Sequence, residues 1–186
     1  MRIISGNLKG KKLSFLSSSA TRPLKDIVKE SIFNVIAHSN LINVKIKNSN
    51  ILDLYSGIGS FGIECISREA KNVTFVENNE KALIALNENL KKLSVQNKAL
   101  LFSKEIKEFL NQINKNVKFD IVFLDPPFLE NKFINDLKLI KKLKILKKNH
   151  LIIIHREKKI IENLDNLFKT LLTKNYGRSK IIFGIF

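Results

Sequence analysis

The stretch "NILDLYSGIGSFGIECISREAKNVTFVE", residues 50 to 77, decides the fold of this chain. It opens on a short apolar run, turns through closely spaced glycines, continues with apolar residues at helical spacing and ends on a second apolar run. A short buried strand, a helix and another strand in this order form a βαβ unit, in which the two strands are parallel. The stretch therefore predicts a parallel sheet with helices packed on it.

The same alternation of short apolar runs and longer amphipathic stretches continues toward the C-terminus. Further helices are expected at residues 79–95, 105–113 and 132–146, and further strands at residues 99–102, 119–125 and 151–155. The end of the chain differs, because strand-like segments at residues 167–176 and 180–186 are separated only by "GRS", which favours an antiparallel hairpin. The expected fold is α/β, a doubly wound, mostly parallel seven-stranded sheet with a C-terminal antiparallel hairpin.

The first 40 residues carry a different pattern. Polar and basic residues with glycines predict a short hairpin, with strands at Arg2–Ile4 and Lys11–Phe15. A helix follows at residues 25–38, and its apolar face is expected to hold Ile27, Val28, Ile32, Val35 and Ile36. The length of 186 residues suits one domain, with residues 1–40 as a basic arm and helix and residues 41–186 as the core.

Net charge is the unusual feature of the composition. The chain has 33 basic and 17 acidic residues, a net charge of +16, which favours a polyanionic partner such as nucleic acid. Lysine, asparagine and isoleucine are used heavily throughout, so a general compositional bias is the alternative explanation. Few of the cations are arginine, and we expect these to mark sites that need a planar, bidentate fork. They are Arg2, Arg22, Arg68, Arg156 and Arg178.

Membrane and metal partners find no support in the sequence. The longest apolar runs, such as "LIII" at residues 151–154, are far too short to cross a membrane, and the N-terminal residues do not resemble a secretory signal. The single cysteine, Cys65, excludes an internal disulfide, offers no metal-ligand spacing and is expected to be a small core residue. We therefore expect a cytoplasmic protein without a metal.

A glycine-rich loop joins the first strand to its helix, with glycines at positions 57, 59 and 62. Glycines let the backbone turn tightly and approach a ligand, and Glu77 at the end of the next strand can bind ribose hydroxyls, as in a dinucleotide site. Asp53 argues against a dinucleotide, because a carboxylate at the mouth of the loop would repel a pyrophosphate. It suits the ammonium group of S-adenosylmethionine, which has a ribose and no phosphate. The loop therefore favours S-adenosylmethionine.

A second loop follows the apolar run "FDIVFLD" and reads Asp125-Pro126-Pro127-Phe128. Neither proline has an N–H, and a residue before proline is extended, so this rim offers only acceptors, the Asp125 carboxylate and the Pro126 carbonyl. Such a rim complements an exocyclic –NH2 group, and Phe128 is placed to stack on a base. The box therefore indicates chemistry at the amine of a nucleobase, which positioning and electrostatics can accelerate without a strong base.

Four stretches of the chain together resemble one known family: "RIISGNLKGKKL", "TRPLKDIVKESIFNVI", "ILDLYSGIGSFGIECISREA" and "FDIVFLDPPF". The glycine loop is typical of class I S-adenosylmethionine-dependent methyltransferases, and the box resembles that of enzymes which methylate exocyclic amines of bases. Over nearly its whole length the chain is similar to the bacterial RsmD family. The resemblance implies a Rossmann-like methyltransferase that methylates N2 of one specific guanine in 16S ribosomal RNA, on the small ribosomal subunit or its late precursor.

The resemblance also implies roles for particular residues. Cofactor contacts would come from Asp53, Tyr55, Gly57, Gly59, Glu77, Asn78, Glu105 and Asp125. The flipped guanine would be held by Asp125, Pro126, Pro127 and Phe128, and RNA phosphates by Arg2, Lys9, Lys11, Lys12 and Arg22. The sequence departs from the family pattern at Glu105, where Asp or Asn is usual near the adenine, at Leu24, which replaces a threonine, and at Asn78-Asn79. A monomer is expected, with residues 1–40 as the RNA-binding arm and helix.

Three other interpretations remain open at this point. A methyltransferase of adenine N6 in DNA or RNA would use the same box, although the chain has no room for a target-recognition domain. A dinucleotide-dependent oxidoreductase would use the glycine loop, and a non-catalytic RNA-binding module would use only the charge. His155, at the end of a strand near the cleft, is expected to be structural or solvent-facing rather than a base. The lysines between residues 141 and 148 are expected to close a helix as solvated surface.

Overall fold

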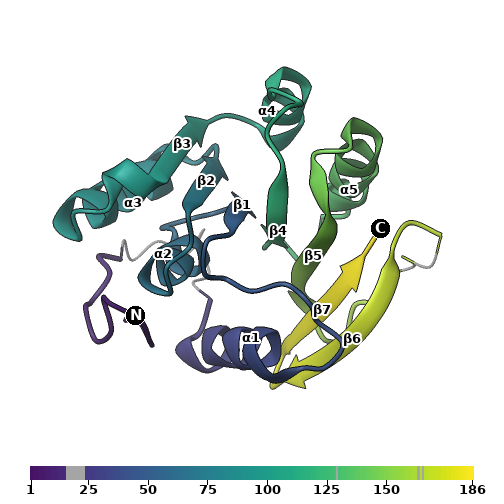
Figure 1. Cartoon of the computed structure of the whole chain (residues 1–186), viewed down its shortest axis with the longest axis horizontal. Coiled ribbons are helices and arrows are strands. Elements are labelled where there is room, and N and C mark those ends of the chain that lie inside the picture. Colours follow the sequence, from purple (N-terminus) through teal and green to yellow (C-terminus); the bar gives the residue numbers. More distant parts are fainter. Residues whose placement is uncertain (16–23, 129, 163, 165) are drawn as a thin grey trace.

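The computed structural model describes residues 1–15, 24–128, 130–162, 164 and 166–186 (Figure 1). Its central element is a seven-stranded sheet in the order β3-β2-β1-β4-β5-β7-β6. The strands are β1 (Asn50–Leu54), β2 (Asn72–Glu77), β3 (Ala99–Ser103), β4 (Phe119–Leu124), β5 (Leu146–Glu157), β6 (Lys169–Tyr176) and β7 (Ser179–Ile185).

Strand direction changes once across the sheet. The first five strands are parallel to one another, whereas β7 is antiparallel to both β5 and β6. The chain builds outward from β1 through β2 to β3, then returns to the other side of β1 with β4 and β5. This arrangement confirms the doubly wound, mostly parallel sheet with a C-terminal antiparallel hairpin, and it creates a reversal of strand order between β1 and β4.

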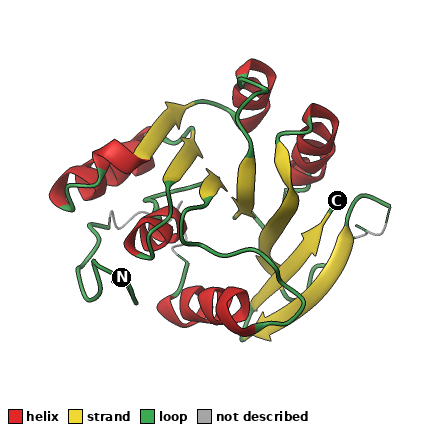
Figure 2. Cartoon of the chain, in the orientation of Figure 1, coloured by secondary structure: helices red, strands yellow, loops and turns green. Residues whose placement is uncertain are grey.

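Helices cover both faces of the sheet (Figure 2). They are α1 (Asp26–His38), α2 (Ser60–Ser67), α3 (Glu80–Lys92), α4 (Ile106–Gln112) and α5 (Lys132–Leu143), with a short 3-10 turn at Gln96–Lys98. Alternate strand residues feed two separate apolar layers, so that Phe123 packs with α1, α2 and α3 while Leu124 packs with α4 and α5. Strands buried on both faces explain the unbroken apolar runs of the sequence. None of the helices in the described ranges is long and apolar enough to span a membrane.

Three local expectations are corrected by the structure. The N-terminal segment pairs through a single antiparallel bridge between Arg2 and Lys12, in place of two strands. On α1, Ile27 is 67% exposed although its type suggested the core face. The helix expected to reach residue 146 ends at Leu143, because Lys144 takes a left-handed conformation with φ of 53°. As a result, the later lysines of the 141–148 run lie on β5 and do not close a helix.

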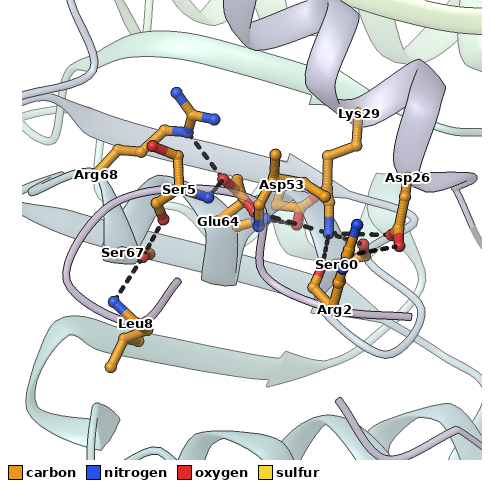
Figure 3. Close-up of polar contacts among 12 residues, drawn as sticks. Arg2, Ser5, Leu8, Asp26, Lys29, Asp53, Ser60, Glu64, Ser67 and Arg68 are labelled. Atoms are coloured by element: carbon orange, nitrogen blue, oxygen red, sulfur yellow. Dashed lines mark hydrogen bonds and ion pairs between the residues drawn. The ribbon is translucent and has the colours of Figure 1, made fainter. Parts of the chain in front are cut away.

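A buried ion pair between α1 and α2 holds the N-terminal arm, described here over residues 1–15, in place (Figure 3). The Lys29 ammonium lies 3.7 Å from the Glu64 carboxylate, and both side chains are fully buried. Lys29 donates to the Arg2 carbonyl at 2.7 Å, while Glu64 accepts the backbone N–H groups of Ile4 at 2.7 Å and Ser5 at 3.0 Å. Burial lowers the pKa of Lys29, and the nearby carboxylates act in the opposite direction. The pair therefore hydrogen-bonds to backbone groups of the arm that would pair with a neighbouring strand in a regular hairpin.

Two further buried side chains extend this attachment along the arm. Ser67 of α2 accepts the N–H of Leu8 and donates to the Ser5 carbonyl. Asn89 of α3 accepts the N–H of Ser14 at 2.7 Å and donates both to the Ser14 carbonyl and to the Ile58 carbonyl, each at 3.2 Å. The arm is thus hydrogen-bonded to side chains of α2 and α3 along most of its described length, and Asn89 ties it to the glycine loop.

Glu64→Gln tests how much the buried pair contributes to stability. The neutral amide leaves the Lys29 charge without its fully buried counter-ion and can no longer accept every arm N–H group. We expect a loss of about 3 to 5 kcal/mol in the free energy of unfolding, measured by urea denaturation. Glu108→Gln is the matched control, because its pair with Lys104 is exposed and should cost about 0 to 1 kcal/mol. Equal losses in the two variants would contradict this account.

Candidate active site

A cavity of about 410 Å³ opens at the carboxyl ends of β1, β2 and β4, where the strand order reverses. Its walls come from the glycine loop, the end of β2 and the box that follows β4. The predicted site residues that line it are Asp53, Tyr55, Gly57, Glu77, Asn78, Asp125, Pro126, Pro127 and Phe128. Two loops more than 60 residues apart in the sequence are therefore brought to one cavity by the pairing of β1 with β4.

Asp53 lies on β1 beneath the glycine loop and is 1% exposed. Its Oδ2 accepts the Gly62 N–H in the first turn of α2 at 3.0 Å, while Oδ1 is buried and has no partner among the described residues. Burial raises the pKa of Asp53 well above its usual range, and the Asp125 and Glu77 carboxylates act in the same direction. The carboxylate already occupies the helix N-terminus where a pyrophosphate would bind. A cationic amine would instead satisfy the free oxygen and offset the buried charge.

Glu77 holds the glycine loop from the end of β2. Its Oε2 accepts the Gly57 N–H at 2.7 Å, and its Oε1 accepts the N–H groups of Asn78 at 3.0 Å and Asn79 at 2.9 Å. Gly57 has a φ of 53°, and a Cβ added there would meet nothing within 4 Å, so the backbone is open toward the cavity. A carboxylate has more lone pairs than these contacts use, so Glu77 can still accept hydroxyl groups.

The remaining predicted cofactor residues stand in different positions around the loop. Gly59 does not line the cavity: its φ is 82°, and a Cβ there would lie 2.4 Å from Leu86, so its role is to let the loop pack on α3. Glu105 is exposed outside the cavity and accepts from the Asn78 side chain at 2.6 Å. Tyr55 lines the cavity, and its hydroxyl donates to Asp136 of α5 at 2.6 Å. Burial raises the pKa of the Tyr55 hydroxyl, which therefore stays a donor.

Arg156 holds the backbone of the box that follows β4. This fully buried guanidinium donates to the Pro127 carbonyl at 3.0 Å and the Phe128 carbonyl at 2.8 Å. It also pairs with Glu162 at 2.7 Å and lies 4.6 Å from the centre of the Phe133 ring. The expectation that arginine marks a bidentate clamp holds here, although the groups clamped are backbone carbonyls of the protein. The Pro126 carbonyl has no protein donor among the described residues, so it is left as an acceptor at the cavity.

His155 of β5 meets the acid of the box. Its Nδ1 lies 2.8 Å from Asp125 Oδ1, its Nε2 lies 2.9 Å from the Ser179 hydroxyl, and the Phe128 ring stands edge-on at 5.3 Å between ring centres. The side chain is buried at the cavity wall, so the solvent-facing alternative is wrong. The sequence offers no local sign of this contact, because it depends on β5 lying beside β4 and β7 lying beside β5.

Two aromatic residues that the sequence analysis did not assign, Phe61 and Phe123, also line the cavity. Phe61 of α2 stacks on Phe123 of β4 at 4.1 Å between ring centres, and Phe33 of α1 extends the stack. Phe123 precedes Asp125 by two residues and so faces the same side of the sheet, a relation that could have identified it. Leu24, the position that replaces a threonine, is a buried apolar contributor to the same cavity.

The residues predicted to contact RNA lie on the outside of the arm. Arg2, Lys9, Lys11 and Lys12 are all exposed, and Phe15, at the end of the described arm, lies at the cavity. Arg22 falls outside the described residues. The arm thus carries its exposed cations along a path that ends at the cavity.

Known proteins resemble this chain over most of its length. The family model described as Conserved hypothetical protein 95 matches residues 1–185. Ribosomal RNA small subunit methyltransferase D of Haemophilus influenzae is 38% identical over 159 residues, which cover 85% of this chain and 79% of that protein. The protein of the same name from Buchnera aphidicola is 34% identical over 174 residues, covering 92% and 87%.

A solved structure extends the match to the arrangement of the elements. The "Putative methyltransferase yhhF" from Escherichia coli has a TM-score of 0.83 and 26% identity, covering 99% of this chain and 96% of that one. The arm, the glycine loop, the box and the C-terminal hairpin all lie within the matched range. The chain therefore belongs to the RsmD family of S-adenosylmethionine-dependent, Rossmann-like methyltransferases.

Proposed function

We propose that this chain transfers a methyl group from S-adenosylmethionine to the exocyclic N2 amine of one guanine in 16S ribosomal RNA of the small subunit. The observation that carries the proposal is that one cavity contains two sets of acceptors. These are the Oδ1 of Asp53, which has no partner in the part of the chain that the structure describes, and the rim at Asp125. The first suits a cationic amine, and the second suits the –NH2 group of a base. The names of the curated relatives support ribosomal RNA of the small subunit as the target.

The cofactor would bind along the glycine loop. Asp53 would take its ammonium group, Glu77 would accept its ribose hydroxyls, and Tyr55, Gly57 and Asn78 would form the adjoining wall. Bound there, S-adenosylmethionine would supply an electrophilic methyl group. Three carboxylates near the cavity, Asp53, Glu77 and Asp125, suit a cationic ligand and disfavour one that carries phosphates.

The target base would enter from the side of the box. Asp125 and the Pro126 carbonyl would accept hydrogen bonds from the two hydrogens of the amine, and Phe128 would stack on the ring. The rigid mounting of this loop on Arg156 would keep the acceptors aligned with the amine. Alignment of this kind can supply most of the rate acceleration in methylation of an amine.

RNA phosphates would be contacted by the arm. We assign this role to the exposed residues Arg2, Lys9, Lys11 and Lys12, and to Arg22 on the basis of its sequence position. Residues 1–40 would form the RNA-binding part and residues 41–186 the catalytic core of a monomeric, cytoplasmic enzyme. The net charge of +16 would favour association with an RNA substrate at low salt.

Labelled methyl transfer to small subunits that lack the modification tests the proposal. Radiolabel from S-adenosylmethionine should appear in N2-methylguanine of 16S ribosomal RNA, with the position mapped by nuclease digestion and mass spectrometry. Label in N6-methyladenine, or label in DNA but not in ribosomal substrates, would assign the box to adenine and overturn the guanine target.

Asp125→Ala should separate turnover from cofactor binding. Loss of the carboxylate removes an acceptor for the amine while leaving Asp53 and Glu77 intact, so we expect kcat to fall by about 100-fold or more. The Kd for S-adenosylhomocysteine, measured by calorimetry, should change by less than about threefold. A large loss of cofactor affinity in this variant would mean that Asp125 serves the cofactor instead of the base.

Asp53→Asn should stabilise the free protein and weaken the binding of the cofactor. Removing a buried charge should raise the Tm of the free protein by about 2 to 4 °C at pH 8, because the amide still accepts the Gly62 N–H. Affinity for S-adenosylhomocysteine should fall by about 30-fold or more, since the ammonium loses its counter-ion.

The Tm difference between the wild type and Asp53→Asn should also depend on pH. Burial raises the pKa of Asp53 in the folded state above its unfolded value, so, as the pH is lowered from 8, the folded wild type takes up a proton at a higher pH than the unfolded chain does. The destabilisation by Asp53 should therefore shrink toward low pH, and the Tm difference between wild type and Asp53→Asn should shrink with it. Parallel Tm curves for the two proteins across this range would contradict the buried-charge account.

A further inference from the structure

Three side chains form a hydrogen-bonded row that starts at the acid of the box. Asp125 follows β4, His155 lies on β5 and Ser179 opens β7, with distances of 2.8 Å and 2.9 Å along the row. The Asp125 side chain is partly open to the cavity, whereas His155 and Ser179 are buried behind it. The C-terminal hairpin therefore contributes a side chain that lies directly behind the wall of the site.

The chemistry of the partners fixes the direction of the first hydrogen bond. An ionised carboxylate can only accept, so Nδ1 of His155 carries the hydrogen that points to Asp125 Oδ1. With Nδ1 as the donor, Nε2 of a neutral ring accepts from the Ser179 hydroxyl, and Ser179 thereby favours the tautomer that Asp125 needs. One carboxylate oxygen is thus occupied by the ring, and Oδ2 has no partner among the described residues.

Orientation of the carboxylate is the property that this contact controls. The χ2 rotation of an aspartate is broad and shallow, so a carboxylate at the end of a strand does not present one oxygen to a ligand by itself. The backbone of the box has a separate support, because Arg156 binds the Pro127 and Phe128 carbonyls from the other face of the sheet. His155 can therefore set the side chain of Asp125 while Arg156 sets the main chain.

We propose that His155, oriented by Ser179, is a positioning residue that holds Asp125 with its free oxygen toward the amine of the target base. This inference rests on the proposed function, and it extends the active site to β5 and β7. It acts through Asp125 and assigns His155 no proton transfer. His155 and Arg156, which are adjacent on β5, would then hold the box from opposite faces of the sheet.

Two substitutions at one position test the proposal. The side-chain amide of His155→Asn lies at the level of Nδ1 and can still donate to Asp125, whereas the amide of His155→Gln lies at the level of Nε2, next to Ser179. We expect His155→Asn to retain kcat within about threefold of wild type and His155→Gln to lose about 10- to 100-fold. The KM for small subunits and the Kd for S-adenosylhomocysteine should change less than twofold in both.

Ser179→Ala is the second test and leaves His155 itself in place. Loss of the hydroxyl frees the ring to rotate or change tautomer, so kcat should fall by about three- to tenfold with an unchanged Tm. The inference is overturned if Asn and Gln at position 155 give equal kcat, or if Tm and cofactor affinity fall in parallel with kcat. Wild-type activity on small subunits is the reference for both comparisons. Absence of that activity would refute the proposed function itself.

Discussion

The reversal of strand order between β1 and β4 is the constraint on which the site depends. The connections that follow β1 and β4 run to opposite faces of the sheet. A crevice therefore remains between the carboxyl ends of these two strands. The glycine loop forms one wall of the resulting crevice and the box forms the other. Asp53 and Asp125, which are 72 positions apart in the sequence, influence each other's electrostatics only because of this pairing.

The chain as a whole is basic, whereas the charged side chains that line the crevice are mostly acidic. The chain as a whole carries a net charge of +16, yet the ionisable side chains named around the cavity are mostly acidic. A polyanion is therefore attracted to the exterior while its phosphates are repelled from the interior. A nucleobase carries no charge, and under the proposed function it is the part of an RNA that such a cavity admits most readily.

The sequence was sufficient for features that rest on local chemistry. The strand–glycine loop–helix unit, the acid at the end of β2 and the Asp-Pro-Pro-Phe box each carry their own pattern, and the structure brings most of their residues to one cavity. The partners of His155, Ser179 and Arg156 could not be predicted, because these contacts depend on which strands become neighbours. Lys29 was missed for another reason. Apolar periodicity favours Ile27, whereas the core accepts a lysine when Glu64 is buried beside it.

The attachment of the arm has a consequence for how the protein folds. Ile4, Leu8 and Ser14 are bonded to side chains that lie 59 to 75 positions later in the chain. Contacts of such high sequence separation form late, because the loops between them must close first. We therefore expect the basic arm to dock late, after α2 and α3 have assembled around the glycine loop.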